Sequence, residues 1–282
     1  MKQSIRDSKG LALASLVLCS FLWSSAGILV KMISWDPFAI AGIRSLIGLL
    51  TMMVFLGKPR LTFSLNQVMA ALWYSATMIL FILANKMTTA ANAVLLQYTE
   101  PVFIILLSRW LLSDEKSGIG DWIAIIGVFA GMILFFLDEL SFQASLGNVL
   151  AVVSGLTFAL TAIFMRRQKD GRPADSFMLA HIITFAVAVP FIAKSGVPSG
   201  SGITGLALLG VFQMGLASIF YSRGVRGVSA ISTALITMIE PVLNPVWVAV
   251  FLGEYPSPRA LLGGGVILAC VTARTVLKAK KI

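Results

Sequence analysis

The sequence has little charge, one histidine and two cysteines, and these shortages argue against several classes of function. Only 12% of its 282 residues are charged, whereas about a quarter of the residues are charged in a typical soluble domain. His181 is the only histidine, and no apolar segment holds an HExxH or paired acidic motif, which argues against a metal-dependent enzyme. The chain contains no GxxxxGK[ST] motif, so direct use of ATP is not expected.

The two cysteines give no indication of a redox function. Cys19 and Cys270 both lie inside apolar segments, where they are expected to pack as small apolar side chains. We therefore predict no catalytic residue, no metal site and no cofactor.

The chain is instead rich in apolar residues, which make up 58% of the total. About twenty helical residues, at a rise of about 1.5 Å each, cross a hydrocarbon core of about 30 Å. Segments of this kind run from Gly10 to Met32, Pro37 to Leu56, Val68 to Asn85, Ala91 to Leu112, Ile119 to Leu137, Gly147 to Met165, Phe177 to Ala193, Ile203 to Tyr221, Ser229 to Leu252 and Arg259 to Leu277. The sequence thus predicts an all-α membrane protein with ten transmembrane helices and no soluble domain.

The positive charge of the chain, +10 in total, is explained by topology rather than by a nucleic-acid partner. If the N-terminus is cytoplasmic, the 22 lysines and arginines all fall at cytoplasmic ends of the segments except Lys31, Arg44, Lys86, Lys194 and Arg259. Lysine and arginine in short loops set the orientation of membrane helices. Both termini are therefore predicted to be cytoplasmic.

Two Glu-Pro pairs, Glu100-Pro101 and Glu240-Pro241, lie 140 residues apart. At this offset residues 79–114 align with residues 219–254 without a gap, and both copies continue with valine. We expect a duplication in which residues 1–139 and 140–282 each form a five-helix repeat. Since each repeat has an odd number of spans, the second is inverted, as in secondary transporters that bind their substrate near the midplane.

These features resemble the drug/metabolite transporter superfamily, specifically its ten-helix members built from two EamA domains. The resemblance covers nearly the whole chain and rests on the duplicated Glu-Pro-Val unit, on Phe251-Leu252-Gly253-Glu254, on Trp23 and on Arg44. The first half departs from this pattern, with Leu112-Ser113-Asp114-Glu115 in place of Leu-Gly-Glu. The resemblance implies a multi-pass protein of the plasma membrane (the inner membrane of a prokaryote) that exports amino acids or other small metabolites.

Glu100 and Glu240 are the first candidates for a functional site. Each lies near the middle of an apolar segment, where a carboxylate costs about 2.5–3.5 kcal/mol on insertion scales. Pro101 and Pro241 each remove a backbone donor, so we expect a bend in both helices, with Pro245 as a further bend in the second.

Helical spacing places a polar stripe beside each glutamate, with Gln97 near Glu100, and Thr237 and Asn244 near Glu240. Two interpretations remain open. In one, the stripes border a hydrated substrate path, and a glutamate exchanges a proton or meets a substrate amine. In the other, each glutamate is protonated and links helices, at about 0.6 kcal/mol for each polar contact. Glu240 is the preferred candidate for coupling.

Four more residues complete the candidate site. Arg44 is expected to form an ion pair with a glutamate, or to snorkel, which means that its charged group reaches the membrane surface. The third possibility is that Arg44 binds a carboxylate of the substrate. The single imidazole, that of His181, suits proton coupling but also fits a hydrogen-bonded packing role. Trp23 and Tyr221 offer aromatic surface, either as ordinary packing or as a pocket wall that contacts an amine by a cation–π interaction.

We therefore predict a secondary transporter that exports an amino acid or other small metabolite by alternating access, coupled to protons or to substrate exchange. Its expected partners are the lipid bilayer, a small-molecule substrate and, in the coupled case, protons. We expect no nucleic acid, and either a monomer or a homodimer. A channel or receptor-like membrane scaffold is the alternative, although no filter-like glycine loop is present.

Overall fold

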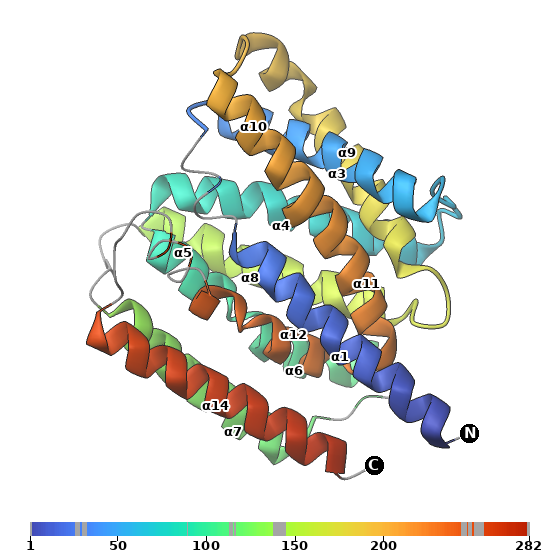
Figure 1. Cartoon of the computed structure of the whole chain (residues 1–282), viewed down its shortest axis with the longest axis vertical. Helices are drawn as coiled ribbons and strands as arrows, with labels where there is room; N and C mark the ends of the chain where they lie inside the picture. The colour runs from blue at the N-terminus through green and yellow to red at the C-terminus, as the bar shows by residue number, and fades with distance from the viewer. Residues whose placement is uncertain are drawn as a thin grey trace.

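The structure is a computed structural model that describes residues 2–25, 29, 33–88, 90–112, 115, 117–137, 145–243, 247, 250 and 257–280. Every regular element within these ranges is helical, and the helices lie side by side in a bundle (Figure 1). In chain order they are α1 (Lys2–Ser24), α3 (Pro37–Leu56), α4 (Leu65–Met87), α5 (Ala90–Gln97), α6 (Glu100–Leu111), α7 (Ile119–Phe136), α8 (Ser145–Arg166), α9 (Pro173–Lys194), α10 (Gly200–Leu208), the π-helix η1 (Leu209–Leu216), α11 (Ala217–Gly227), α12 (Ala230–Thr237) and α14 (Pro258–Lys280).

The helical class agrees with the prediction from sequence. Among the described residues, 8 helical stretches are long and apolar enough to cross a membrane, and two shorter apolar helices, Lys9–Ser24 and Ala230–Leu243, accompany them. Several helices begin earlier than predicted, among them α4 at Leu65 and α9 at Pro173. Their first turns are favoured by the hydroxyl of Ser64, which accepts from a backbone N–H of α4, and by the proline that opens α9.

The outside of the bundle is apolar. Val54, Trp110 and Ile119 are exposed by 81%, 77% and 82%. Many smaller aliphatic side chains of α3, α7 and α14 are also exposed. Apolar surface of this extent is not typical of a soluble monomer, whereas lipid accommodates it without cost.

Helices α7 and α14 approach each other through glycine. A Cβ atom on Gly263 would lie 2.5 Å from the carbonyl oxygen of Gly131 and 2.5 Å from the backbone nitrogen of Phe135. A side chain at this position would therefore force the two helices apart. Small residues that allow such close backbone contact are typical of helix interfaces in membranes.

The helices of the two halves of the chain interlock. Helix α4 packs along α8, and α11 packs along α1 in the corresponding way, while α4 contacts α9 as η1 contacts α3. Two further pairs, α3 with α9 and α7 with α14, join corresponding helices of the two halves directly. Because one hydrophobic core includes side chains from both halves, neither half stands as a separate body.

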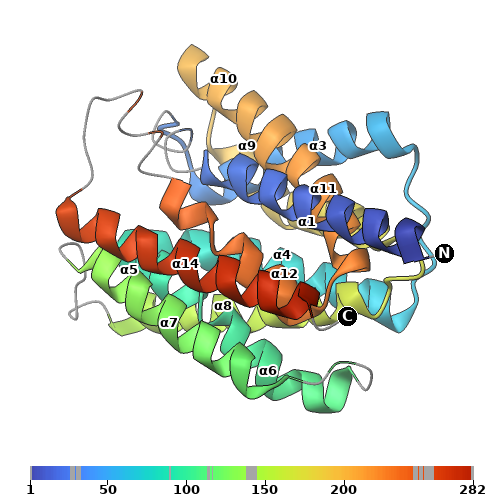
Figure 2. The ribbon, with the colours of Figure 1, turned by 60° about the horizontal axis from the view of Figure 1, so that its bottom comes forward.

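Both chain termini lie at the same end of the bundle (Figures 1 and 2). Glu115, which follows α6, ties several elements together at this end. Its carboxylate pairs with Arg166 at the end of α8 and accepts a hydrogen bond from the backbone N–H of Ala230, at 2.8 Å. Arg166 also donates to the carbonyl oxygens of Val225, at 2.7 Å, and Arg226, at 2.8 Å. The ends of α6, α8, α11 and α12 are thereby joined.

A second ion pair links α7 and α14 near the same end. Nη2 of Arg274 lies 2.7 Å from Oδ1 of Asp121. One turn further along α14, Lys278 donates to the hydroxyl of Ser229 at 2.9 Å. Ser229 directly precedes α12, so α14 is connected to the same group of helix ends.

We predict that Glu115→Gln lowers the thermal stability of the purified protein. The amide removes the charge that pairs with Arg166, and the loss of a charged hydrogen-bond partner costs about 1–3 kcal/mol. The measurement is the Tm in detergent, and the matched control is Asp170→Asn, an exposed acid in the loop after α8. Equal Tm values for the two variants would contradict the proposed role of Glu115 in holding the helix ends.

Candidate functional site

Both helices that carry a Glu-Pro pair are interrupted just before the glutamate. Helix α5 ends at Gln97 and α6 begins at Glu100, while α12 ends at Thr237 and helical structure resumes at Glu240. Each proline lacks the N–H that would donate to the carbonyl four residues earlier, which removes one bond from the helix. Each predicted bend therefore coincides with a two-residue turn between helical segments, in which Thr99 and Met238 keep αR backbone angles. The predicted bend at Pro245 lies outside the described residues.

The two breaks have the same backbone geometry. Four backbone bonds recur at the 140-residue offset. Two of them are Tyr98 N to Val94 O (3.1 Å) and Val102 N to Thr99 O (3.0 Å), whose equivalents are Met238 N to Ala234 O (3.2 Å) and Val242 N to Ile239 O (3.1 Å). Each glutamate is consequently the first residue of a new helical segment. The helix dipole favours negative charge at such a position.

A hydrogen bond connects the two breaks. The hydroxyl of Tyr98 donates to Oε2 of Glu240 at 2.7 Å, although the two residues are 142 positions apart in the chain. Tyr98 is buried and Glu240 is partly buried. The interrupted helices of the two halves therefore meet inside the bundle through a phenol and a carboxyl group.

This contact is not repeated by the corresponding residues. Met238 stands where the first half has Tyr98, and its thioether has no proton to donate to Glu100. Glu100 is 0% exposed, and neither carboxyl oxygen has a hydrogen-bond partner within the described ranges. Glu240, Tyr98 and Tyr221 all lie within electrostatic range of Glu100. Of two equivalent glutamates, one is therefore hydrogen-bonded and the other is not.

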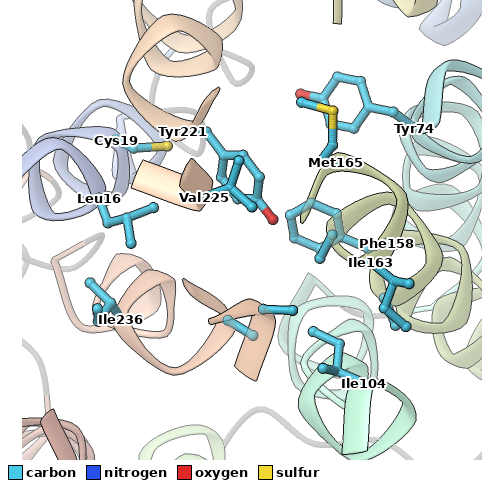
Figure 3. Packing of buried hydrophobic residues seen from close by; sticks show 14 of the residues in the cluster. Leu16, Cys19, Tyr74, Ile104, Phe158, Ile163, Met165, Tyr221, Val225 and Ile236 are labelled. Atoms are coloured by element: carbon cyan, nitrogen blue, oxygen red, sulfur yellow. The ribbon is translucent and has the colours of Figure 1, made fainter. Parts of the chain in front are cut away.

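Aromatic side chains pack beside the two carboxyl groups. Tyr221 of α11 is central, with its ring centroid 5.5 Å from that of Trp23, 6.2 Å from that of Phe158 and 5.5 Å from that of Phe177. In Figure 3 the ring of Tyr221 extends from α11 with its hydroxyl end toward Phe158. That hydroxyl is buried and has no hydrogen-bond partner in the described structure. Trp23 and Tyr221, both predicted as pocket walls, are thus brought together.

Arg44 and His181 form a separate group of buried polar side chains. Arg44, on α3, is 6% exposed and interacts electrostatically with Tyr74 and His181. The expected ion pair is absent, because among the described residues, which include both glutamates, no acidic group lies within salt-bridge distance of Arg44. The interpretation of His181 as a hydrogen-bonded packing residue also fails, since both ring nitrogens lack a partner in the described ranges. Its ring lies 6.1 Å from that of Tyr74.

The polar stripes expected beside the glutamates are only partly present. Gln97 donates to the hydroxyl of Ser154 on α8 at 2.8 Å, and Thr237 donates to a backbone carbonyl of its own helix. Asn244 lies outside the described residues. Regular helical spacing does not hold here, because a two-residue turn separates Gln97 from Glu100 and another separates Thr237 from Glu240. Gln97 and Thr237 are therefore bound to neighbours in this conformation.

The described side chains do not assemble a metal site. Within them, no three His, Cys, Asp or Glu residues are grouped closely enough to hold an ion. Cys19 lies in the hydrophobic core and Cys270 packs against it, and both are free thiols. The chemistry available to the site consists of carboxyl, hydroxyl, imidazole and guanidinium groups.

Sequence reasoning missed Tyr98. It lies two residues before Glu100, but its hydrogen bond is with the other glutamate, which no local pattern reveals. The sequence offers one indication of this role. In the internal alignment Tyr98 of the first half is aligned with Met238 of the second half, so only the first half has a hydroxyl at this position. A difference of this kind within an otherwise similar repeat is a reason to suspect unequal roles.

Comparison with known proteins gives a consistent result over the whole chain. The EamA-like transporter family matches residues 9–137 and again residues 145–273. An uncharacterized transporter of Archaeoglobus fulgidus is 24% identical over 265 residues, which cover 92% of this chain and 94% of that one. The pseudopaline exporter CntI of Pseudomonas aeruginosa (strain UCBPP-PA14) is 28% identical over 273 residues, covering 90% and 93%. One solved crystal structure has a similar fold, with a TM-score of 0.82 at 17% identity over 97% of this chain and 99% of the other.

We predict that Tyr98→Phe lowers the Tm more than Tyr221→Phe does. Both substitutions delete one hydroxyl from a buried tyrosine, but only that of Tyr98 makes a hydrogen bond in the described structure. Loss of this bond leaves the partly buried carboxyl of Glu240 without its donor, at a cost of about 1–3 kcal/mol. Thermal unfolding in detergent provides the measurement. A Tyr98→Phe variant as stable as Tyr221→Phe would show that the bond contributes nothing.

Proposed function

Because the chain belongs to the EamA-like transporter family and is a multi-pass membrane transporter, we propose that it is a secondary active exporter of an amino acid or another small metabolite. The relatives that cover nine-tenths of the chain are described as transporters, and one of them as an exporter. Export is for this reason the proposed direction. The proposed location is the inner membrane of a prokaryote.

The observation that carries this proposal is the meeting of two interrupted helices inside the bundle. Broken helices place backbone and side-chain polar groups at membrane depth, which is tolerated where these groups line a cavity or are buried in protein. In secondary transporters such helices form the substrate site at the interface of two repeats. Here the link between the breaks is the Tyr98–Glu240 hydrogen bond.

Within this site we assign different roles to the two glutamates. Glu240 is held by Tyr98 and has a mainly positioning role. Glu100 has no partner in the described structure, and a buried carboxylate without a donor or cation is strongly disfavoured. Glu100 therefore carries a proton in this conformation and releases it when a cationic group of the substrate arrives. Competition between a proton and a substrate amine for one carboxyl group provides proton-coupled exchange.

The proposed mechanism is alternating access between two inverted repeats, residues 1–139 and 140–282. The contacts between the two halves support a two-fold relation between them. Helix α4 of the first half contacts α8 of the second, and the corresponding helices α11 and α1 contact each other in the same way. The position of both termini at one end of the bundle supports an even number of crossings (Figure 2). Ten crossings with both termini in the cytoplasm fit these features.

Counterflow in liposomes tests the function directly. Purified protein should accumulate a labelled amino acid or metabolite against a preloaded excess of the same compound, and the initial rate should saturate with concentration. Empty liposomes and liposomes with heat-denatured protein are the controls. A flux that rises linearly with concentration and shows no counterflow would identify a channel instead.

The inverted arrangement predicts that Ser141 and Asp170 lie on opposite sides of the membrane. Single cysteines at these two positions, in a background with Cys19→Ala and Cys270→Ala, should react differently with a membrane-impermeant maleimide. In intact cells Ser141→Cys should be labelled, and Asp170→Cys should be labelled only after the membrane is opened. Labelling of both from the outside would rule out this topology.

A further inference from the structure

Arg44 is a buried cation with no counter-ion among the described residues. Its side chain is 6% exposed, and Nε has no hydrogen-bond partner among the described residues. Glu100 and Glu240 are both described, and neither forms an ion pair with it. A guanidinium group offers five N–H donors and stays protonated in proteins. The described residues therefore leave a positive charge uncompensated within a membrane-spanning helix, a costly arrangement that usually marks a functional site.

Snorkelling does not account for this residue. A snorkelling arginine keeps its charged group in contact with water or lipid headgroups, whereas Arg44 packs on the side of α3 that is buried against the neighbouring helices. Its electrostatic neighbours are Tyr74 of α4 and His181 of α9. The charge therefore points into the protein rather than toward the membrane surface.

The groups around Arg44 have hydrogen-bonding capacity to spare. Both nitrogens of His181 are unpartnered in the described structure, and His181 is 0% exposed. The hydroxyl of Ser218 on α11 is also buried, and its neighbour is the side chain of Tyr74. A guanidinium, an imidazole N–H and hydroxyl groups are donors. A carboxylate accepts hydrogen bonds only, so it satisfies several of these donors and neutralises Arg44 at once.

We propose that Arg44, with His181 and Ser218, binds a carboxylate group of the transported molecule. This inference rests on the proposed function and names the substrate class: a compound with a carboxylate for Arg44 and an amine for Glu100. The residues near Arg44 and those near Glu100 are linked by the rings of Tyr74, Phe177 and Tyr221, with centroid distances of 4.5 Å and 5.5 Å between successive rings. This spacing favours a substrate whose amine and carboxylate are on different carbon atoms.

Binding to the purified protein in detergent tests the inference without requiring transport. The probes are a matched series with the same carbon chain: ε-aminocaproate, caproate and hexylamine. We expect ε-aminocaproate to raise the Tm most, and the two singly charged compounds to raise it less. Glycine, which has both groups on one carbon, should have a smaller effect than ε-aminocaproate. A series in which no carboxylate stabilises the protein overturns the proposal.

The variant Arg44→Gln separates charge recognition from other effects. Its affinity for ε-aminocaproate should fall on the order of tenfold or more, since a charged hydrogen-bonded contact is lost. Its affinity for hexylamine should not change. Arg44→Lys should restore part of the carboxylate affinity, which a purely structural role would not predict. Unchanged carboxylate affinity in a folded Arg44→Gln variant overturns the assignment.

A chloride titration against gluconate distinguishes a substrate carboxylate from an inorganic anion as the ligand. Chloride is expected to compete weakly with caproate. Stabilisation by chloride that equals that by caproate would indicate an inorganic-anion site and would overturn the substrate assignment. Failure of the proposed function has a different signature: the probes would bind with the predicted dependence on Arg44, but liposomes would show no counterflow.

Discussion

The hydrogen bond between Tyr98 and Glu240 is the contact around which the interior of this protein is organised. It joins two helices that belong to different halves of the chain, at the point where each is interrupted by a Glu-Pro pair. Proline explains each interruption, because the missing N–H leaves the helix one bond short. The bond then determines which of two equivalent glutamates is satisfied. Glu100 is left as a buried carboxyl group without a hydrogen-bond partner among the described residues.

Polar chemistry is distributed unevenly along the bundle. At the end that holds both termini, Glu115, Arg166, Asp121 and Arg274 are joined in well-formed ion pairs. The interior, by contrast, holds four buried polar side chains from four different helices: Glu100, Arg44, His181 and Tyr221. Each has at least one atom without a hydrogen-bond partner among the described residues. Native proteins leave few buried polar groups unpaired. The proposed substrate site accounts for this concentration of unpaired groups, whereas the ion pairs join the helix ends.

Much of the architecture follows from sequence patterns. The apolar segments predict the helices, since a spanning helix needs about twenty apolar residues, and the duplicated Glu-Pro-Val units indicate the family. The bends predicted at Glu100 and Glu240 correspond to two-residue turns between helical segments, and a sequence does not show how far a helix yields at proline. Of the roles considered for Arg44, the ion pair with a glutamate is absent among the described residues, since the pairing of charges depends on tertiary packing. Tyr98 was missed for the same reason, its partner lying 142 residues away.

The central claim is that Glu100, rather than Glu240, is the carboxyl group for which a proton and the substrate compete. The pH dependence of substrate affinity, measured on purified wild-type protein and on Glu100→Gln and Glu240→Gln, tests it most directly. Glu240, Tyr98 and Tyr221 are the other titratable groups identified near Glu100. Affinity should fall with decreasing pH in the wild type and in Glu240→Gln, whose amide oxygen still accepts from Tyr98, and should lose this dependence in Glu100→Gln. A Glu100→Gln variant that keeps the full pH dependence would contradict the claim.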